Sequence, residues 1–183
     1  MRAVAVLLAL LVGLVADADT ALAQVAYMRS GWEFRGGVLA HDVPGLWSGF
    51  RLERGVDINA ELLFGAGLPF AGGTFRPAAG ASVNTEGFTS RVYVDARWEY
   101  ATPSGIFLGL GLGGAVHDGL LDPTDPDKKA LGSRILFHIP IEIGFRFDQH
   151  NSISVYFEHM SNAHLVHTNE GLDSIGVRYG YRF

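Results

Sequence analysis

The most constraining feature of the chain is a strict two-residue alternation between Arg134 and Asp148. A two-residue period is that of a β-strand, because successive side chains of a strand point to opposite faces. One face carries charged residues, which would be unusual inside a soluble core but suits the polar lumen of a barrel whose outside meets lipid. The apolar face consists of Ile135, Phe137, Ile139, Ile141, Ile143, Phe145 and Phe147.

Similar segments recur and bring the number of predicted strands to eight. Alternation is clear in residues 56–64 and 91–100, and the further candidates are residues 31–40, 74–84, 105–116, 151–161 and 171–183. The last of these ends in Phe183 and resembles the C-terminal signal of outer-membrane barrels. We therefore predict an all-β fold, an eight-stranded antiparallel transmembrane barrel of the outer-membrane type.

The connections between these strands fit such a barrel, which alternates tight periplasmic turns with longer outer loops. Residues 101–104 and 148–151 are predicted to be tight turns, and residues 41–53, 117–132 and 162–170 to be outer loops. Residues 65–73, rich in glycine, are predicted to be a longer periplasmic turn.

The first 23 residues have the features of a cleaved secretory signal peptide: Arg2, an apolar stretch from Val4 to Val15, and a small-residue cleavage site ending at Ala23. We predict a signal peptide over 1–23 and one barrel domain over 24–183. The chain has no cysteine, which excludes disulfides, thiolate metal sites and a cysteine nucleophile. The net charge of −5, without a basic block, argues against nucleic-acid binding.

Three polar side chains interrupt the apolar outward face where two predicted strands reach the outer loops. Counting by twos along residues 151–161 places His159 and Ser161 on the outward face, and counting back from Phe183 places Asp173 there too. A serine, a histidine and a carboxylate within hydrogen-bond reach form a nucleophilic hydrolase set, to which Asn162 could add an oxyanion donor. The alternative is that these residues only mark the boundary between hydrocarbon and headgroups.

The spacing of this motif resembles that of the PagL-like lipid A 3-O-deacylases, also called acyloxyacyl hydrolases. The resemblance rests on His159-x-Ser161-Asn162-Ala163 followed by Asn169-x-Gly171-x-Asp173-Ser174, with framework matches over 37–42, 55–59, 80–85, 111–117 and 131–137. It implies that Ser161 is the nucleophile, His159 the general base and Asp173 the acidic member, with Asn162 at the oxyanion hole and Asn169 a further motif residue. The chain departs from the best-known members, which have glutamate at position 173 and glycine at position 164.

The resemblance implies an outer-membrane serine esterase of a Gram-negative bacterium. Such an enzyme removes the 3-O-linked acyl chain of lipid A in the outer leaflet, as a 3-hydroxy fatty acid, and needs no metal or cofactor. The alternative is a non-enzymatic barrel with a structural or surface-interaction role, followed by a pore. The sequence leaves open whether the barrel forms a homodimer.

The remaining polar residues are interpreted as structural. Glu142, Arg146, Glu158, Arg178 and Arg182 have inward parity and are predicted to pair inside the barrel. His41, His117 and His138 lack the spacing of a zinc site and are interpreted as loop or lumen groups.

Overall fold

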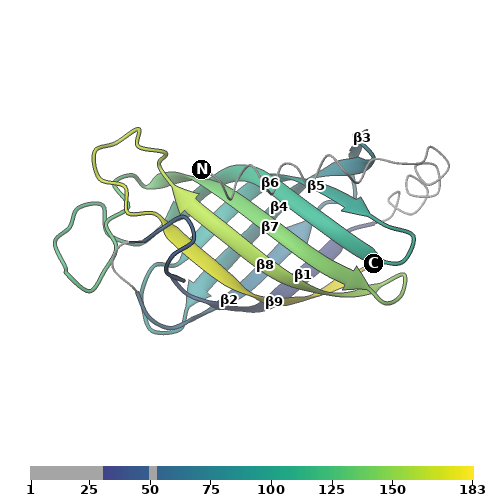
Figure 1. The fold of residues 1–183 in the computed structure, drawn as a ribbon, viewed down its shortest axis with the longest axis horizontal. Coiled ribbons are helices and arrows are strands. Elements are labelled where there is room, and N and C mark those ends of the chain that lie inside the picture. Colours follow the sequence, from purple (N-terminus) through teal and green to yellow (C-terminus); the bar gives the residue numbers. More distant parts are fainter. Residues whose placement is uncertain (1–30, 50–52) are drawn as a thin grey trace.

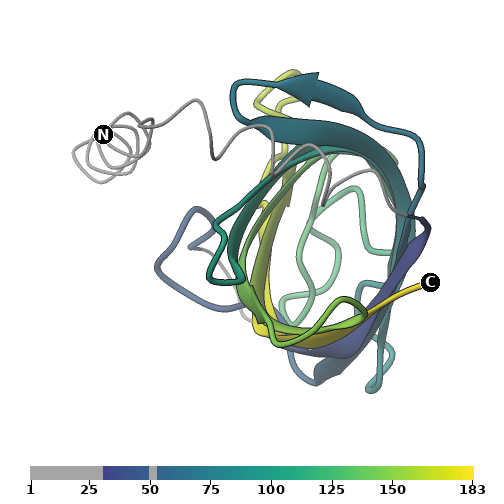
Figure 2. The same ribbon diagram turned by 90° about the vertical axis from the view of Figure 1, so that its right-hand side faces the viewer.

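The chain forms a closed antiparallel barrel (Figures 1 and 2). The computed structural model describes residues 31–49 and 53–183, so the predicted signal peptide lies outside the described residues. Nine strands are formed by the described residues, in the order β2-β1-β9-β8-β7-β6-β5-β4-β3, and an additional β2–β4 pairing closes the ring. Their bounds are β1 Glu33–Ala40, β2 Val56–Leu63, β3 Leu68–Phe70, β4 Gly73–Asn84, β5 Arg91–Ala101, β6 Ile106–His117, β7 Ile135–Arg146, β8 Asn151–Ser161 and β9 Leu172–Arg182.

The eight strands of the ring match the eight predicted from the sequence, with ends that differ by at most about two residues. The prediction was wrong for residues 65–73, which contain the short strand β3 rather than only a turn. After β2 ends at Leu63, the chain pairs again with the start of β4, so that Leu68 lies opposite Phe75. This hairpin lies on the outside of the barrel wall, near the end that carries the tight turns (Figures 1 and 2).

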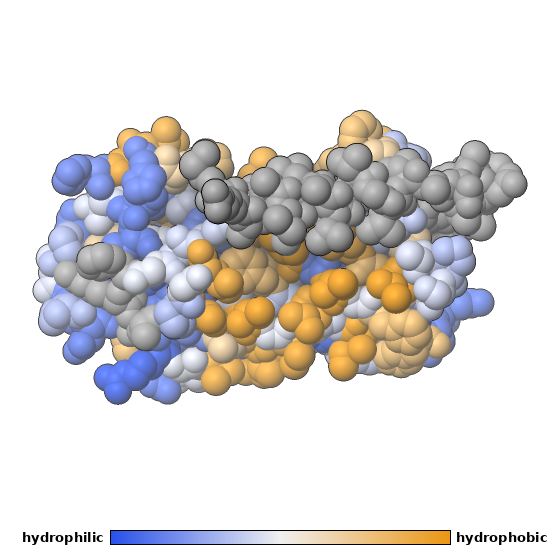
Figure 3. Space-filling model, in the orientation of Figure 1, coloured by the Kyte–Doolittle hydropathy of each residue, from blue (hydrophilic) through white to orange (hydrophobic). Residues whose placement is uncertain are grey.

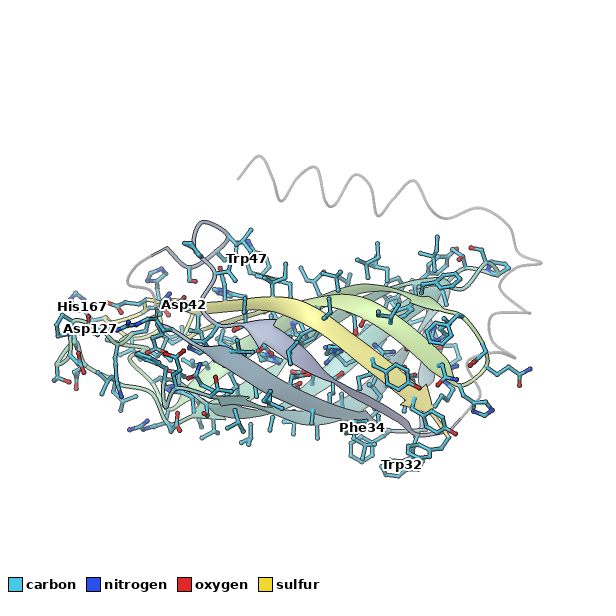
Figure 4. All side chains as sticks on the ribbon, turned by 90° about the horizontal axis from the view of Figure 1, so that it is seen from below. Trp32, Phe34, Asp42, Trp47, Asp127 and His167 are labelled. Atoms are coloured by element: carbon cyan, nitrogen blue, oxygen red, sulfur yellow. The ribbon has the colours of Figure 1, made fainter. Side chains whose placement is uncertain are left out.

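The outer surface of the barrel is apolar, as predicted for a wall that meets lipid. Figure 3 shows apolar residues gathered over the middle of the barrel and polar residues over the end with the long loops. Aromatic side chains collect near the opposite end, where Figure 4 labels Trp32 and Phe34 and where Tyr179, Tyr181 and Phe183 are also exposed. Such a girdle marks a membrane–water interface. No helix in residues 31–49 and 53–183 is long and apolar enough to cross a membrane.

The inside of the barrel is filled by paired charges and aromatic rings. Arg178 lies 2.6 Å from Glu142 and 3.2 Å from Glu61, and both carboxylates also pair with Arg97. The predicted inward pairing is confirmed for all five residues, through the pairs Arg178–Glu142, Arg146–Glu99, Arg182–Glu33 and Arg91–Glu158. Buried charges need partners of this kind. A lumen filled in this way does not suit a pore.

The outer end of the lumen is closed by apolar side chains. Leu131, from the loop between β6 and β7, is fully buried against Leu136, Met160 and Leu172 of the barrel strands. In chain order, the first outer loop is residues 41–55, the second is residues 85–90, the third is residues 118–134 and the fourth is residues 162–171. These loops leave the barrel at the end where Figure 4 labels Asp42, Asp127 and His167.

Candidate active site

The register between β8 and β9 brings the predicted residues together. Asp173 is the direct cross-strand partner of His159, and Ser161 lies two residues beyond His159 on the same face of β8. Directly opposed residues of antiparallel strands have Cβ atoms only about 4.5–5.5 Å apart. An aspartate at position 173 can therefore reach the imidazole without the extra methylene of glutamate.

The three side chains form a continuous hydrogen-bonded chain. His159 Nδ1 lies 2.6 Å from Asp173 Oδ1, and His159 Nε2 lies 2.9 Å from Ser161 Oγ. With the ring proton on Nδ1 directed to the carboxylate, Nε2 can accept the hydroxyl proton of Ser161. This is the arrangement that activates a serine hydroxyl for nucleophilic attack.

The first outer loop supports Asp173 in a way that the sequence did not indicate. Asp173 Oδ2 accepts hydrogen bonds from the main-chain N–H groups of Trp47 and Ser48, both at 2.7 Å. Asp173 is fully buried and His159 nearly so, although both have the outward parity that was predicted. The loop, rather than lipid, covers them.

The fourth outer loop begins immediately after Ser161 and is held by two asparagines. The Asn162 side-chain nitrogen donates to the carbonyl oxygens of Leu131 at 2.9 Å and Thr168 at 2.6 Å, and the Asn162 main-chain N–H donates to Asn169 Oδ1 at 3.0 Å. Both amide hydrogens of Asn162 are thus committed to main-chain carbonyls.

Two consecutive residues of this loop have left-handed backbones. Ala163 has a φ of 53° and His164 a φ of 59°. A glycine adopts this conformation without strain, which gives a physical reason for the glycine that the best-known members of the family in the resemblance have at position 164. The main-chain N–H groups of Ala163 and His164 donate to no group within the described part of the chain.

The base of the first outer loop is fastened inside the mouth of the barrel. His41 bonds Glu53 through Nε2 and Asp57 through Nδ1, each at 2.9 Å, and Asp42 pairs with Lys129 at 2.7 Å. Burial of His41 opposes its protonation, but the hydrogen bonds to Asp57 and Glu53 outweigh this and raise the pKa of His41. Burial by itself would raise the pKa of Glu53, but hydrogen bonds from His41 and from main-chain N–H groups outweigh this and lower the pKa.

His117 and His138, the other two histidines considered above as metal ligands, have protein partners as well. His138 lies between Asp95 at 2.9 Å and Glu158 at 2.8 Å, and His117 Nε2 lies 2.7 Å from the carbonyl oxygen of Ser133. Among residues 31–49 and 53–183, no group of three or more histidine, aspartate or glutamate side chains is arranged to hold a metal ion.

An apolar groove adjoins Ser161 on the outside of the barrel. It has a volume of about 260 Å³ and lies between β6, β7 and the fourth outer loop. Phe137, one of its lining residues, is the direct cross-strand partner of Ser161. The groove is also lined by Gly113, Gly114, Ile135, Leu165 and Val166.

A transmembrane-type barrel with a Ser–His–Asp chain on its outer wall and an apolar groove beside the serine has the features of a membrane-embedded hydrolase. Comparison with known proteins agrees with this class. A model of the family described as lipid A 3-O-deacylase (PagL) matches residues 25–182. The chain belongs to this family, and so to the ester hydrolases.

Two relatives illustrate the similarity. The lipid A deacylase PagL of Bordetella bronchiseptica is 28% identical over 148 residues, which cover 79% of this chain and 74% of that protein. A solved structure described as the outer membrane enzyme PagL superimposes with a TM-score of 0.63 at 22% identity, covering 81% of this chain and 97% of the other. The structural match supports the same barrel fold.

Proposed function

We propose that this protein is an outer-membrane lipid A 3-O-deacylase in which Ser161, His159 and Asp173 form the catalytic triad. The observation that carries the proposal is the hydrogen-bonded chain Asp173–His159–Ser161 at the outer rim of the barrel wall. A structural barrel has no need of such a chain on its outer wall, where buried polar groups are costly unless they are paired. Membership of the deacylase family supports the substrate.

The reaction follows from these positions. Ser161 Oγ attacks the carbonyl carbon of the 3-O-linked ester while His159 Nε2 takes the hydroxyl proton, and Asp173 stabilises the resulting imidazolium. Collapse of the tetrahedral intermediate breaks the bond between the acyl carbon and the sugar oxygen, and that oxygen takes the proton from His159 and leaves as a hydroxyl group. Water then hydrolyses the acyl-enzyme and releases the 3-hydroxy fatty acid, with His159 again acting as base.

The oxyanion is assigned to main-chain donors rather than to the Asn162 side chain expected from the sequence. Both amide hydrogens of Asn162 already bond to carbonyl oxygens, whereas the N–H groups of Ala163 and His164 donate to none of the residues that the structure describes. In this proposal Asn162 and Asn169 hold the fourth outer loop so that those N–H groups lie ready beside Ser161.

The apolar groove beside Ser161 is proposed to receive the acyl chain that is removed. Lipid A would reach the groove by lateral diffusion in the outer leaflet, so no opening into the filled lumen is needed. Burial of the acyl chain would orient the ester at Ser161. We further propose that residues 1–23 are the signal peptide that directs export. A dimer is not required, because all three triad residues come from one chain.

Mass spectrometry of lipid A from cells that produce the wild type or Ser161→Ala tests this function. The wild type is expected to remove one 3-hydroxyacyl group and Ser161→Ala to remove none, while both migrate as folded, heat-modifiable barrels. Ser104→Ala, in the turn at the other end of the barrel, serves as the matched control and should retain activity. Unchanged lipid A with folded wild type in the outer membrane would favour a structural role.

A further inference from the structure

The outward face of β8 changes abruptly from exposed to covered as it approaches the site. Ile153 and Val155 are 55% and 48% exposed, whereas His159, on the same face, is only 9% exposed. The indole of Trp47 forms part of the cover, because its ring centroid lies 5.0 Å from that of His159 at an interplanar angle of 88°. The same indole lies 5.7 Å from the ring of Phe157 at 76°.

The segment that carries Trp47 also grips Asp173 through main-chain atoms. Besides the two N–H donors at Asp173 Oδ2, the Val43 N–H donates to the Asp173 carbonyl oxygen at 2.8 Å. The carboxylate therefore has one oxygen bound to His159 and the other held by the loop. With both oxygens held, the carboxylate cannot rotate, and it fixes the orientation of the His159 imidazole.

Side chains also hold the described part of this segment against the barrel. Its base is fastened by His41 and Asp42, and among the described residues of the loop Trp47 places an aromatic ring against the barrel wall beside Asp173. Figure 4 shows Trp47 on the first outer loop, outside the wall of the barrel. The neighbouring Leu46 is comparably exposed, at 54% against 47% for Trp47. The edge-to-face contacts that Trp47 makes with Phe157 and His159 are of the kind that stabilise aromatic packing.

We infer that Trp47 is a positioning residue for the proposed reaction. Its indole, seated on Phe157 and His159, holds the first outer loop against the barrel, and the loop in turn presents the N–H groups of residues 47 and 48 to Asp173. The inference rests on the proposed function, because it requires His159 and Asp173 to activate Ser161. It differs from a lipid-binding role, since Trp47 acts on the reactivity of Ser161 whether or not lipid A is present.

The rate at which a small alkyl fluorophosphonate labels Ser161 separates these two roles, because the probe reports serine activation without lipid binding. Trp47→Ala in detergent is expected to slow labelling about tenfold or more, since hydrogen bonds to a charged group are lost. Trp47→Phe, which keeps a ring on Phe157, should stay within about threefold of the wild type. Leu46→Ala is the matched control and should label at the wild-type rate.

A second comparison shows whether Trp47 acts through Asp173. In an Asp173→Asn background, adding Trp47→Ala should slow labelling little further, because residues that act as a unit are not additive. Heat-modifiable migration checks that each variant is folded. Trp47→Leu, which keeps apolar bulk but loses the ring contacts to Phe157 and His159, serves in its place should Trp47→Ala not fold, and is likewise expected to slow labelling.

The outcomes distinguish this inference from the function on which it rests. Labelling of Trp47→Ala at the wild-type rate, with Ser161→Ala unlabelled, would overturn the positioning role and leave the triad intact. Fully additive slowing in the Asp173→Asn background would do the same. Wild-type protein that is not labelled at Ser161 would overturn the nucleophile assignment and the inference with it.

Discussion

Replacing Asp173 by asparagine is the most informative single change to the site. The new amide oxygen can keep the two hydrogen bonds from the N–H groups of Trp47 and Ser48, so the first outer loop should remain in place. The amide nitrogen must then face His159 Nδ1 and donate to it. This forces the ring proton onto Nε2, which can no longer accept the proton of Ser161.

The expected loss can be estimated from this wrong tautomer. The equivalent acid-to-amide change in a serine protease triad lowers kcat about 10⁴-fold. Four decades correspond to about 5.4 kcal/mol of transition-state stabilisation. KM should change little, because Asp173 is fully buried and does not reach the substrate.

The assay is the initial rate of fatty acid release from purified lipopolysaccharide, measured by mass spectrometry over a range of substrate concentrations. Asp148→Asn, in the exposed turn between β7 and β8, is the matched control and should keep the wild-type kcat. A folded Asp173→Asn variant whose kcat falls less than about tenfold would refute the role assigned to Asp173.

Three further predictions concern the site and the loops that support it. Gly114→Phe should favour substrates with shorter acyl chains, because a Cβ at this position meets only a carbonyl oxygen at 3.8 Å and the rest of the side chain enters the groove. Each methylene displaced from the groove costs about 0.8 kcal/mol of burial, and an unchanged chain-length profile for synthetic substrates would contradict the groove assignment. Gly132→Ala should lower kcat, because its Cβ would lie 1.9 Å from the Thr168 carbonyl oxygen at a φ of 75° and displace the fourth outer loop; activity equal to wild type would show that this loop does not position the site. The contribution of His41 to the free energy of unfolding should be fully present below about pH 6.5 and lost as the pH rises through its raised folded-state pKa, whereas the contribution of Glu53, whose pKa is lowered, should be lost in acid. Thermal unfolding measured against pH should show this alkaline loss in the wild type and not in His41→Gln. An alkaline loss that persists in His41→Gln would argue against the role of His41.

Much of the fold follows from local pattern. The two-residue alternation in β7 assigns every side chain to lumen or lipid, because strand geometry leaves no other period. The failure at β3 is equally physical. Leu68 to Phe70 is only three residues long and wholly exposed, so it buries no face that could leave an alternating signature.

The sequence by itself determined the eight strands of the ring and the shared outward face of His159, Ser161 and Asp173, the residues of the proposed triad, because parity along two strands joined by a short loop fixes that face. Only the tertiary structure decided what surrounds them. Trp47 and Asp173 are separated by more than a hundred residues, and their contact depends on how the first outer loop folds back over the barrel wall. The hydrogen bonds from main-chain N–H groups to Asp173, and those from Asn162 to the carbonyl oxygens of Leu131 and Thr168, each have a main-chain partner, whose side chain leaves no signature of the bond. No periodicity in the sequence could therefore reveal them.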